Sequence, residues 1–160
     1  MVWVRFDDAT PSHPKVLELS DAAFRLWFNG LCYCNSELTD GRIPRRMVPR
    51  LTDADDWRAL VGELTRPHVA GRAPLWHQGE DGALYVHDYT DYQPSSVQQQ
   101  RYRAAKRLGM RIRRALDRLG LDSHRLSADD YASLDGEHAW LRDHFEADDG
   151  GGYRRVPVRA

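Results

Sequence analysis

The chain has 160 residues, of which 41% are hydrophobic and 29% are charged, and its formal net charge at pH 7 is −1. This size and composition allow one ordinary hydrophobic core with an appended helical piece. No apolar run reaches the roughly 18 residues that a membrane span needs, and the N-terminus lacks the succession of regions that marks a signal peptide. We therefore expect a cytoplasmic protein with no membrane contact.

The first part of the chain predicts a short strand, a loop and a long helix. Alternating apolar residues at 2–6 indicate the strand, and the two prolines that follow indicate the loop. Ser20 is a good N-cap with Asp21 in the first turn, so a helix is expected at about 21–38. Because apolar residues cover more than one of its faces, we expect this helix to be central and buried.

The next segment predicts two shorter helices and a hairpin. The helices are expected at 45–51 and at 54–66, the second capped by Thr52 or Asp53. Ile43 lies in a very short predicted strand. Two β-rich runs, LWHQ and ALYVHDY, flank the sequence GEDG, which is typical of a hairpin. Three helices followed by a hairpin indicate a winged helix-turn-helix.

The positive charge of the chain is concentrated in its middle. Residues 1–94 carry 10 Lys and Arg against 14 Asp and Glu, residues 95–126 carry 9 against 2, and residues 127–160 carry 4 against 8. A basic block therefore lies between two acidic ones. A polyanion would respond to this local field rather than to the charge of the whole chain.

The basic block has the periodicity of a single helix. Arginines recur at steps of three and four, and apolar residues recur likewise on a stripe about 120° away. The arginine row consists of Arg103, Arg107, Arg111, Arg114 and Arg118. The apolar seam consists of Ala105, Leu108, Ile112, Ala115 and Leu119. Such a helix can pack by its seam while it projects guanidinium groups, which make bidentate contacts with phosphates.

The C-terminal quarter predicts a helix and then a flexible tail. Ser127 and Asp130 form a capping-box pattern, which indicates a helix start. The segment Asp148 to Gly152 and the residues after it are expected to be flexible. The predicted segments are a winged-helix domain at 1–94, a basic amphipathic helix at 95–120, an acidic helical extension at 121–147 and a flexible tail at 148–160.

Three stretches carry a resemblance to a known family. They are HPKVLELSDAAFRLWF near the start, LTDGRIP in the middle and LYVHDYTDYQPS before the basic helix. Over roughly residues 1–118, the chain resembles the winged-helix domain of replication-initiation or replisome-organiser proteins of actinobacterial phages and prophages. The resemblance implies a small DNA-binding protein that marks or opens a replication origin, or that recruits a replicative helicase or its loader.

The predicted fold class is α+β and mainly helical, with a winged helix-turn-helix followed by a long basic helix and an acidic helical tail. The predicted function is binding of double-stranded DNA in phage or prophage replication initiation. Phosphate contacts of this kind position a protein on DNA without specifying the sequence. The candidate DNA-binding residues are Arg45, Arg46, Arg50, His77, Gln78, Arg101, Arg103, Lys106, Arg107, Arg111, Arg114 and Arg118.

Two other functions remain open. The second helix of a helix-turn-helix enters the major groove by its N-terminus, yet carboxylates cluster at 53–56 in this position. This favours a protein-docking module, in which Leu108, Ile112, Ala115 and Leu119 form a homodimer or partner seam. A phage transcriptional repressor is the third possibility, and it predicts a dimer on a palindromic site.

Catalysis and metal binding find little support. Cys32 and Cys34 are two apart in a predicted helix and point to nearly opposite sides, so neither a disulfide nor a zinc site is expected. The His87-Asp88 pair lies at a strand end without further ligands. The sequence contains no GxxxxGK[ST], GxGxxG or GxSxG pattern. We expect no enzyme activity, no metal and no cofactor.

Overall fold

The structure, a computed structural model, describes residues 3–68 and 70–158. Its fold is α+β, with many helices and two small antiparallel sheets. The chain divides into two compact units, unit 1 up to residue 99 and unit 2 from residue 100. Each unit has a hydrophobic core of its own.

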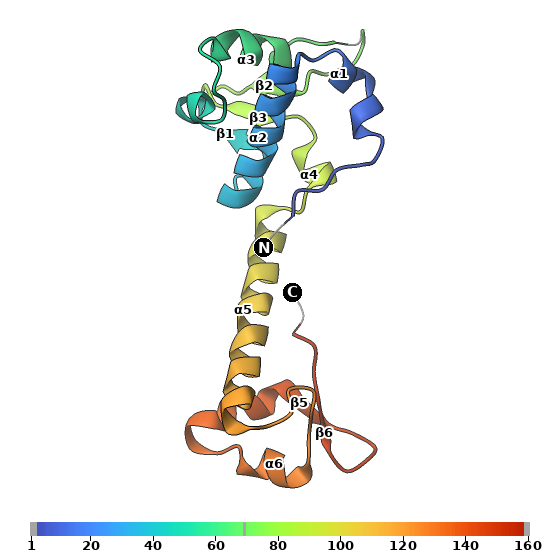
Figure 1. Ribbon diagram of the computed structural model, residues 1–160, viewed down its shortest axis with the longest axis vertical. Coiled ribbons are helices and arrows are strands. Elements are labelled where there is room, and N and C mark those ends of the chain that lie inside the picture. The colour runs from blue at the N-terminus through green and yellow to red at the C-terminus, as the bar shows by residue number, and fades with distance from the viewer. Residues whose placement is uncertain (1–2, 69, 159–160) are drawn as a thin grey trace. The chain divides into compact units, whose positions relative to one another are not determined.

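Unit 1 is built around one long helix and a three-stranded sheet (Figure 1). The sheet is antiparallel, and its strand order is β1-β3-β2. The elements of unit 1 are η1 (Thr10–Ser12), α1 (Pro14–Leu17), α2 (Asp21–Glu37), β1 (Arg42–Ile43), η2 (Arg45–Arg50), α3 (Trp57–Thr65), β2 (Trp76–Gln78), β3 (Leu84–Val86) and α4 (Tyr89–Tyr92).

The ends of α2 are fixed by local chemistry. Ser20 Oγ accepts a hydrogen bond from the backbone N–H of Ala23 at 3.2 Å, which satisfies one of the free donors at the helix start. Ser20 Oγ also donates to the carboxylate of Glu63 in α3 at 2.9 Å, which ties the two helices together. At the other end, Leu38 adopts the left-handed conformation with φ of 59°, and α2 stops there.

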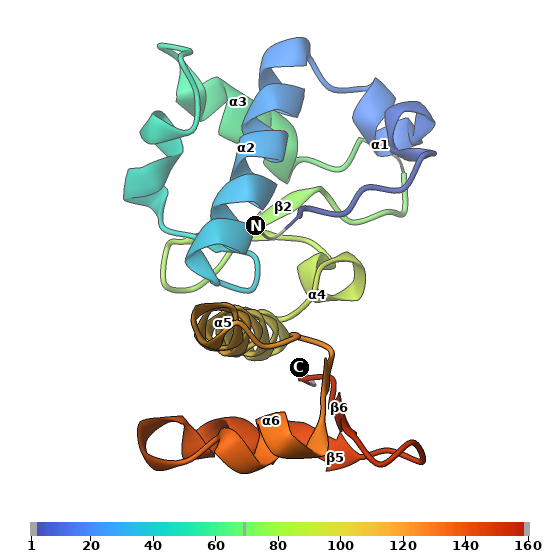
Figure 2. The same ribbon diagram turned by 60° about the horizontal axis from the view of Figure 1, so that its bottom comes forward.

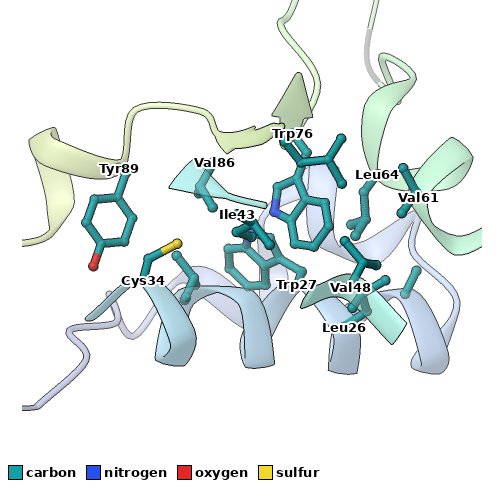
Figure 3. Close-up of a cluster of buried hydrophobic side chains, with 13 residues drawn as sticks. Leu26, Trp27, Cys34, Ile43, Val48, Val61, Leu64, Trp76, Val86 and Tyr89 are labelled. Carbon is teal, nitrogen blue, oxygen red and sulfur yellow. The ribbon is translucent and has the colours of Figure 1, made fainter. Parts of the chain in front are cut away.

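The core of unit 1 lies between α2, α3 and the sheet (Figure 3). Leu26 and Cys34 of α2 are fully buried there, and so is Trp76 of β2. Gly30 allows the close approach, because a Cβ at this position would lie 2.6 Å from the Trp76 ring. The prediction that this helix is central is therefore confirmed, but its burial is confined to one side, since Phe24 and Phe28 are exposed.

Unit 2 is built on the second long helix and a second sheet (Figure 2). The helix starts in the last residues of unit 1, and its remaining length belongs to unit 2. Ile112 and Leu116 of this helix are fully buried against Leu126, Leu134 and Leu141. The elements are α5 (Ser96–Leu119), β4 (Arg125–Leu126), α6 (Ala128–Ser133), η3 (Gly136–His144), β5 (Phe145–Ala147) and β6 (Tyr153–Arg155), and the antiparallel strand order is β4-β6-β5.

The two units repeat one topology. In each, a long helix is followed by a strand of 2 residues, helices of 6 and 9 residues, and two strands of 3 residues. In each, the third strand lies in the middle of the sheet. The registers also agree, since the first residue of the first strand pairs with the middle residue of the third in both sheets, Arg42 with Tyr85 and Arg125 with Arg154.

The ends of the long helices align the two units residue by residue. The N–H of Thr39 donates to the carbonyl of Cys34 at 3.1 Å, and the N–H of Leu121 donates to the carbonyl of Leu116 at 3.0 Å. Cys34 and Leu116 are therefore equivalent, and Leu116 follows Cys34 by 82 positions. Both side chains are fully buried.

Several predictions for unit 1 need correction. Residues 3–6 form no strand, and Val2 lies outside the described residues. The second short helix starts at Trp57, because the side chain of Asp56, rather than of Thr52 or Asp53, caps it by accepting from Ala59 N at 3.1 Å. The hairpin of β2 and β3 and the short strand at Ile43 are confirmed.

The predictions for the C-terminal quarter need larger corrections. The capping box of Ser127 and Asp130 is confirmed, but only short helices follow it, and the chain continues in strands instead of a helical extension over 121–147. The predicted flexible tail contains β6, which pairs with both β4 and β5. β6 completes the sheet that covers the apolar seam of α5.

The predicted dimer seam is also corrected. Ile112 is fully buried in the core of unit 2, and Leu108 and Ala115 pack against the same core. Leu119, at the end of the helix, is 40% exposed. Leu108, Ile112 and Ala115 therefore pack within their own chain, and only Leu119 of the predicted seam is left at the surface.

Candidate nucleic-acid interface

The packing of α5 decides where its arginines lie. Because Ile112 and Leu116 face the core, residues about 120° away around the helix stay at the surface. The arginine row occupies this position, and four of its members are exposed on the part of α5 that belongs to unit 2. The four are Arg107, Arg111, Arg114 and Arg118.

These four arginines line an open groove of about 700 Å³ between α5 and η3, which we call the arginine groove. Met110 and Ala115 of α5 also line it, and η3 supplies its other wall. The residues of η3 in this wall are Glu137, His138 and Trp140.

Trp140 holds one of the arginines in place. The guanidinium carbon of Arg111 lies 4.4 Å from the centroid of the Trp140 ring, a cation–π contact. The Trp140 ring in turn meets His144 edge-on at 5.8 Å. This contact orders a long side chain before any ligand arrives, which lowers the entropy that binding would cost.

The positive charge of the arginine groove is not neutralised by its surroundings. Among the described residues, no carboxylate lies within 4.0 Å of the guanidinium nitrogens of these four arginines. The ion pair within α5 joins Arg113 to Asp117 at 3.9 Å, outside the arginine row. Glu137, the acidic residue of the groove wall, lies 3.8 Å from His138. The groove can therefore attract a ligand with several negative charges.

Unit 1 has a groove along the equivalent face of α2, and its other wall is formed by residues 50–53. Counting back 82 positions from Arg111, Arg114 and Arg118 gives Asn29, Cys32 and Ser36 of α2. These three residues line a groove of about 440 Å³. The position of Arg107 is filled by Arg25, whose guanidinium pairs with Asp53 at 3.4 Å. The shared topology therefore does not need arginines at these positions.

The predicted residues of unit 1 lie elsewhere. Arg45, Arg46 and Arg50 are exposed on η2, and Arg45 lies 5.9 Å from the centroid of the Trp57 ring. The start of α3 is flanked by carboxylates, among them Asp56, which serves as its cap. This arrangement repels phosphate at the helix that would enter the groove of DNA.

The remaining predicted residues are placed separately. His77 and Gln78 are exposed on β2, and the His77 ring stacks on Tyr85 with a centroid distance of 5.5 Å. Arg101 is exposed on α5 but outside the arginine groove, and Arg103 is half-buried on the same helix. Lys106 lines a different groove, on the other side of α5.

Sequence reasoning missed the partners of α5. Trp140 and His138 fall in a segment that was predicted only as an acidic extension, and Arg154 and Arg155 fall in the predicted flexible tail. Their positions depend on the β4-β6-β5 sheet, whose strands are too short to give a sequence pattern. Arg113 could have been predicted to act with Lys106, because it follows Lys106 by two helical turns and so lies on the same face of the helix.

Metal clusters, thiol ionisation and membrane-spanning helices also bear on the kind of site in the described ranges. In residues 3–68 and 70–158, no three His, Cys, Asp or Glu side chains group closely enough to hold a metal ion. Burial raises the pKa of the Cys34 thiol to about 11, which disfavours the reactive thiolate. None of the helices in the described part of the chain is both long and apolar enough to cross a membrane. Comparison of the chain with protein-family models, curated proteins and solved structures found no match.

Proposed function

We propose that this protein binds double-stranded DNA through the arginine row of α5. The observation that carries the proposal is the contrast between the two units. Arg111, Arg114 and Arg118 line the groove of unit 2, whereas neutral side chains occupy the equivalent positions of unit 1. One topology forms with either set, so a polyanionic ligand explains the arginines better than packing does.

The spacing of the arginines suits a duplex. At a rise of about 1.5 Å per residue, the stretch from Arg107 to Arg118 covers about 16 Å. Duplex DNA presents about one phosphate for each 1.7 Å of its axis. Four guanidinium groups on this stretch can each neutralise a phosphate and release a counterion.

The resemblance to replication-initiation proteins directs this activity to a phage or prophage replication origin. Unit 1 supports the winged-helix part of the proposal by its order of elements from α2 to β3 and by its sheet order β1-β3-β2. Residues 1–94 carry more Asp and Glu than Lys and Arg, 14 against 10. We therefore assign DNA to unit 2 and a protein partner, a replicative helicase or its loader, to unit 1.

Fluorescence anisotropy of the full chain with a random duplex tests the proposal. Four phosphate contacts predict a slope of log affinity against log salt of about −3.6. Absence of binding at low salt would reject DNA as the ligand and leave the protein-docking function. That function predicts capture of a helicase or loader with no salt-dependent affinity for DNA.

A phage transcriptional repressor is the alternative within DNA binding. It requires two copies on a palindromic site. Burial of Ile112 removes the dimer seam that the sequence suggested, which favours the origin-binding function. Sedimentation of the protein–DNA complex distinguishes the two, because a repressor would bind a short palindrome as a dimer.

A further inference from the structure

A second groove runs along the opposite side of α5. It has a volume of about 830 Å³ and lies between α5 and the C-terminal segment, so we call it the C-terminal groove. Its basic residues are Lys106, Arg113, His124, Arg154 and Arg155. Helix α5 is thus bordered by basic grooves on both sides.

Met110 marks the crest between the two grooves. It lines both of them and is 47% exposed. Two residues along a helix turn by about 200°, so Met110 points nearly opposite to the buried Ile112. The surface of α5 therefore consists of an apolar crest with cations on either flank.

The two flanks differ in how their cations are used. Arg155 donates to the carbonyls of Gly109 at 3.2 Å and Ser123 at 3.4 Å, which holds β6 to α5. Arg154 pairs with Glu146 at 3.0 Å. Arg113 lies 3.9 Å from Asp117 in an exposed ion pair, a weak contact that a phosphate can replace. In the C-terminal groove, the phosphate contacts therefore fall to Lys106 and Arg113, which lie two helical turns apart on one stripe.

From this arrangement we propose that α5 lies in the major groove of B-form DNA, with one phosphate backbone in the arginine groove and the other in the C-terminal groove. The inference rests on the proposed function. A helix with its side chains is about 10–12 Å across, and the major groove is about 12 Å wide. Cations on both flanks then meet both strands, and the crest faces the base edges.

The crest and the other helices agree with this assignment. Met110 is apolar, and apolar side chains in the major groove contact the methyl group of thymine. In a helix-turn-helix, α3 would be the helix that enters the groove, but carboxylates flank its start at Asp53, Asp55 and Asp56. Helix α5 carries the positive charge that a helix in the major groove requires.

The test compares three ligands of equal length and equal phosphate charge, with the full chain and fluorescence anisotropy. One is an unmodified DNA duplex, one is a duplex with glucosylated 5-hydroxymethylcytosine, which fills the major groove, and one is duplex RNA. The deep, narrow major groove of RNA does not admit side chains. We expect binding to both altered ligands to be at least about 10-fold weaker, and a minor-groove ligand such as distamycin to leave binding to the unmodified duplex unchanged.

Paired variants test the second flank. Lys106→Gln with Arg113→Gln should weaken binding about as much as Arg107→Gln with Arg114→Gln, since each pair removes two phosphate contacts. Arg45→Gln with Arg46→Gln, on unit 1, is the matched control and should bind like the natural chain.

The outcomes separate the inference from the proposed function. Equal, salt-dependent binding of unmodified and glucosylated DNA would overturn the insertion of α5 and leave DNA binding intact. Competition by distamycin would indicate that the protein binds in the minor groove, which would also overturn the insertion of α5 in the major groove. If the unmodified duplex is not bound, the proposed function fails, and the inference fails with it.

Discussion

Arg125 and Asp148 of unit 2 form the same ion pair as Arg42 and Asp81 of unit 1. In each unit, the arginine Nε lies 2.8 Å from an oxygen of an aspartate in the turn between the last two strands. The arginine is in each case the first residue of the first strand. The pair therefore ties that strand to the turn and is part of the repeated topology.

Asp148 should make the stability of unit 2 depend on acid pH. The hydrogen bond from Arg125, followed by that from the Gly152 N–H, lowers the pKa of the Asp148 carboxyl. A carboxyl with a lowered pKa stabilises the fold above its unfolded pKa of about 3.9, and this contribution disappears as pH falls through the lower folded value. Asp148→Asn should therefore lower the urea midpoint at pH 6, and the difference should shrink below about pH 3.

The control for this prediction is Asp149→Asn, which removes the same charge from the same turn. Circular dichroism over a urea series at both pH values provides the measurement. An equal effect of the two variants at pH 6 would show that net charge, not the bond to Arg125, is responsible.

Ile112→Ala should destabilise unit 2 strongly. The side chain is fully buried, and removing it leaves a cavity, so we expect a loss of about 2–5 kcal/mol. Leu119→Ala, at the exposed end of the same seam, should cost less than about 1 kcal/mol. Urea unfolding measures both changes. If the seam served dimerisation, each substitution would instead lower the sedimentation coefficient and leave the stability of the monomer unchanged.

Gly30→Ala should destabilise unit 1. The new Cβ would lie 2.6 Å from the Trp76 ring and 2.9 Å from Ile43, and such overpacking typically costs about 1–3 kcal/mol. Gly62→Ala is the matched control in α3. Among the described residues, no side chain and no backbone atom beyond the adjacent turns of α3 lies within 4 Å of its new Cβ, so the better helix propensity of alanine should stabilise the protein by up to about 1 kcal/mol. A neutral Gly30→Ala would contradict the close packing of α2 on the sheet.

Trp140→Leu should weaken DNA binding modestly. The substitution keeps an apolar side chain but removes the ring that orders Arg111, and a cation–π contact at an exposed site is worth about 0.5–1 kcal/mol, or two- to five-fold in affinity. Trp57→Leu is the control, because the Trp57 ring holds Arg58 at 4.5 Å in unit 1 in the same manner. Anisotropy at fixed salt gives the two affinities. Equal losses would argue against a special role for the arginine groove.

Local signals explain what could be predicted from the sequence. The steps of three and four in the arginine row predicted a helix at 95–120, and α5 spans Ser96–Leu119. The turn sequence GEDG predicted the hairpin of β2 and β3, because its glycines suit a tight turn between two β-rich runs. Both features depend on residues that are close in the chain.

The features that the sequence did not predict depend on distant residues. Arg125 in β4 pairs with Arg154 in β6, 29 positions later, and strands this short show no periodicity. The repeat was also hidden, because equivalent positions share burial without sharing residue type: Cys34 corresponds to Leu116, and Gly30 to Ile112. The wall of the arginine groove at Trp140 could not be predicted before this sheet was known.

The measurement that tests the central claim most directly compares two variants of equal charge in the salt series. One replaces the four arginines of the arginine groove by glutamine, and the other replaces Arg45, Arg46, Arg50 and Arg58 of unit 1. The account predicts that the first variant loses the part of the slope that four phosphate contacts contribute, about −3.6, while the second variant keeps the full slope of the natural chain. The opposite result, with binding lost only in the unit 1 variant, would contradict the assignment of DNA to α5.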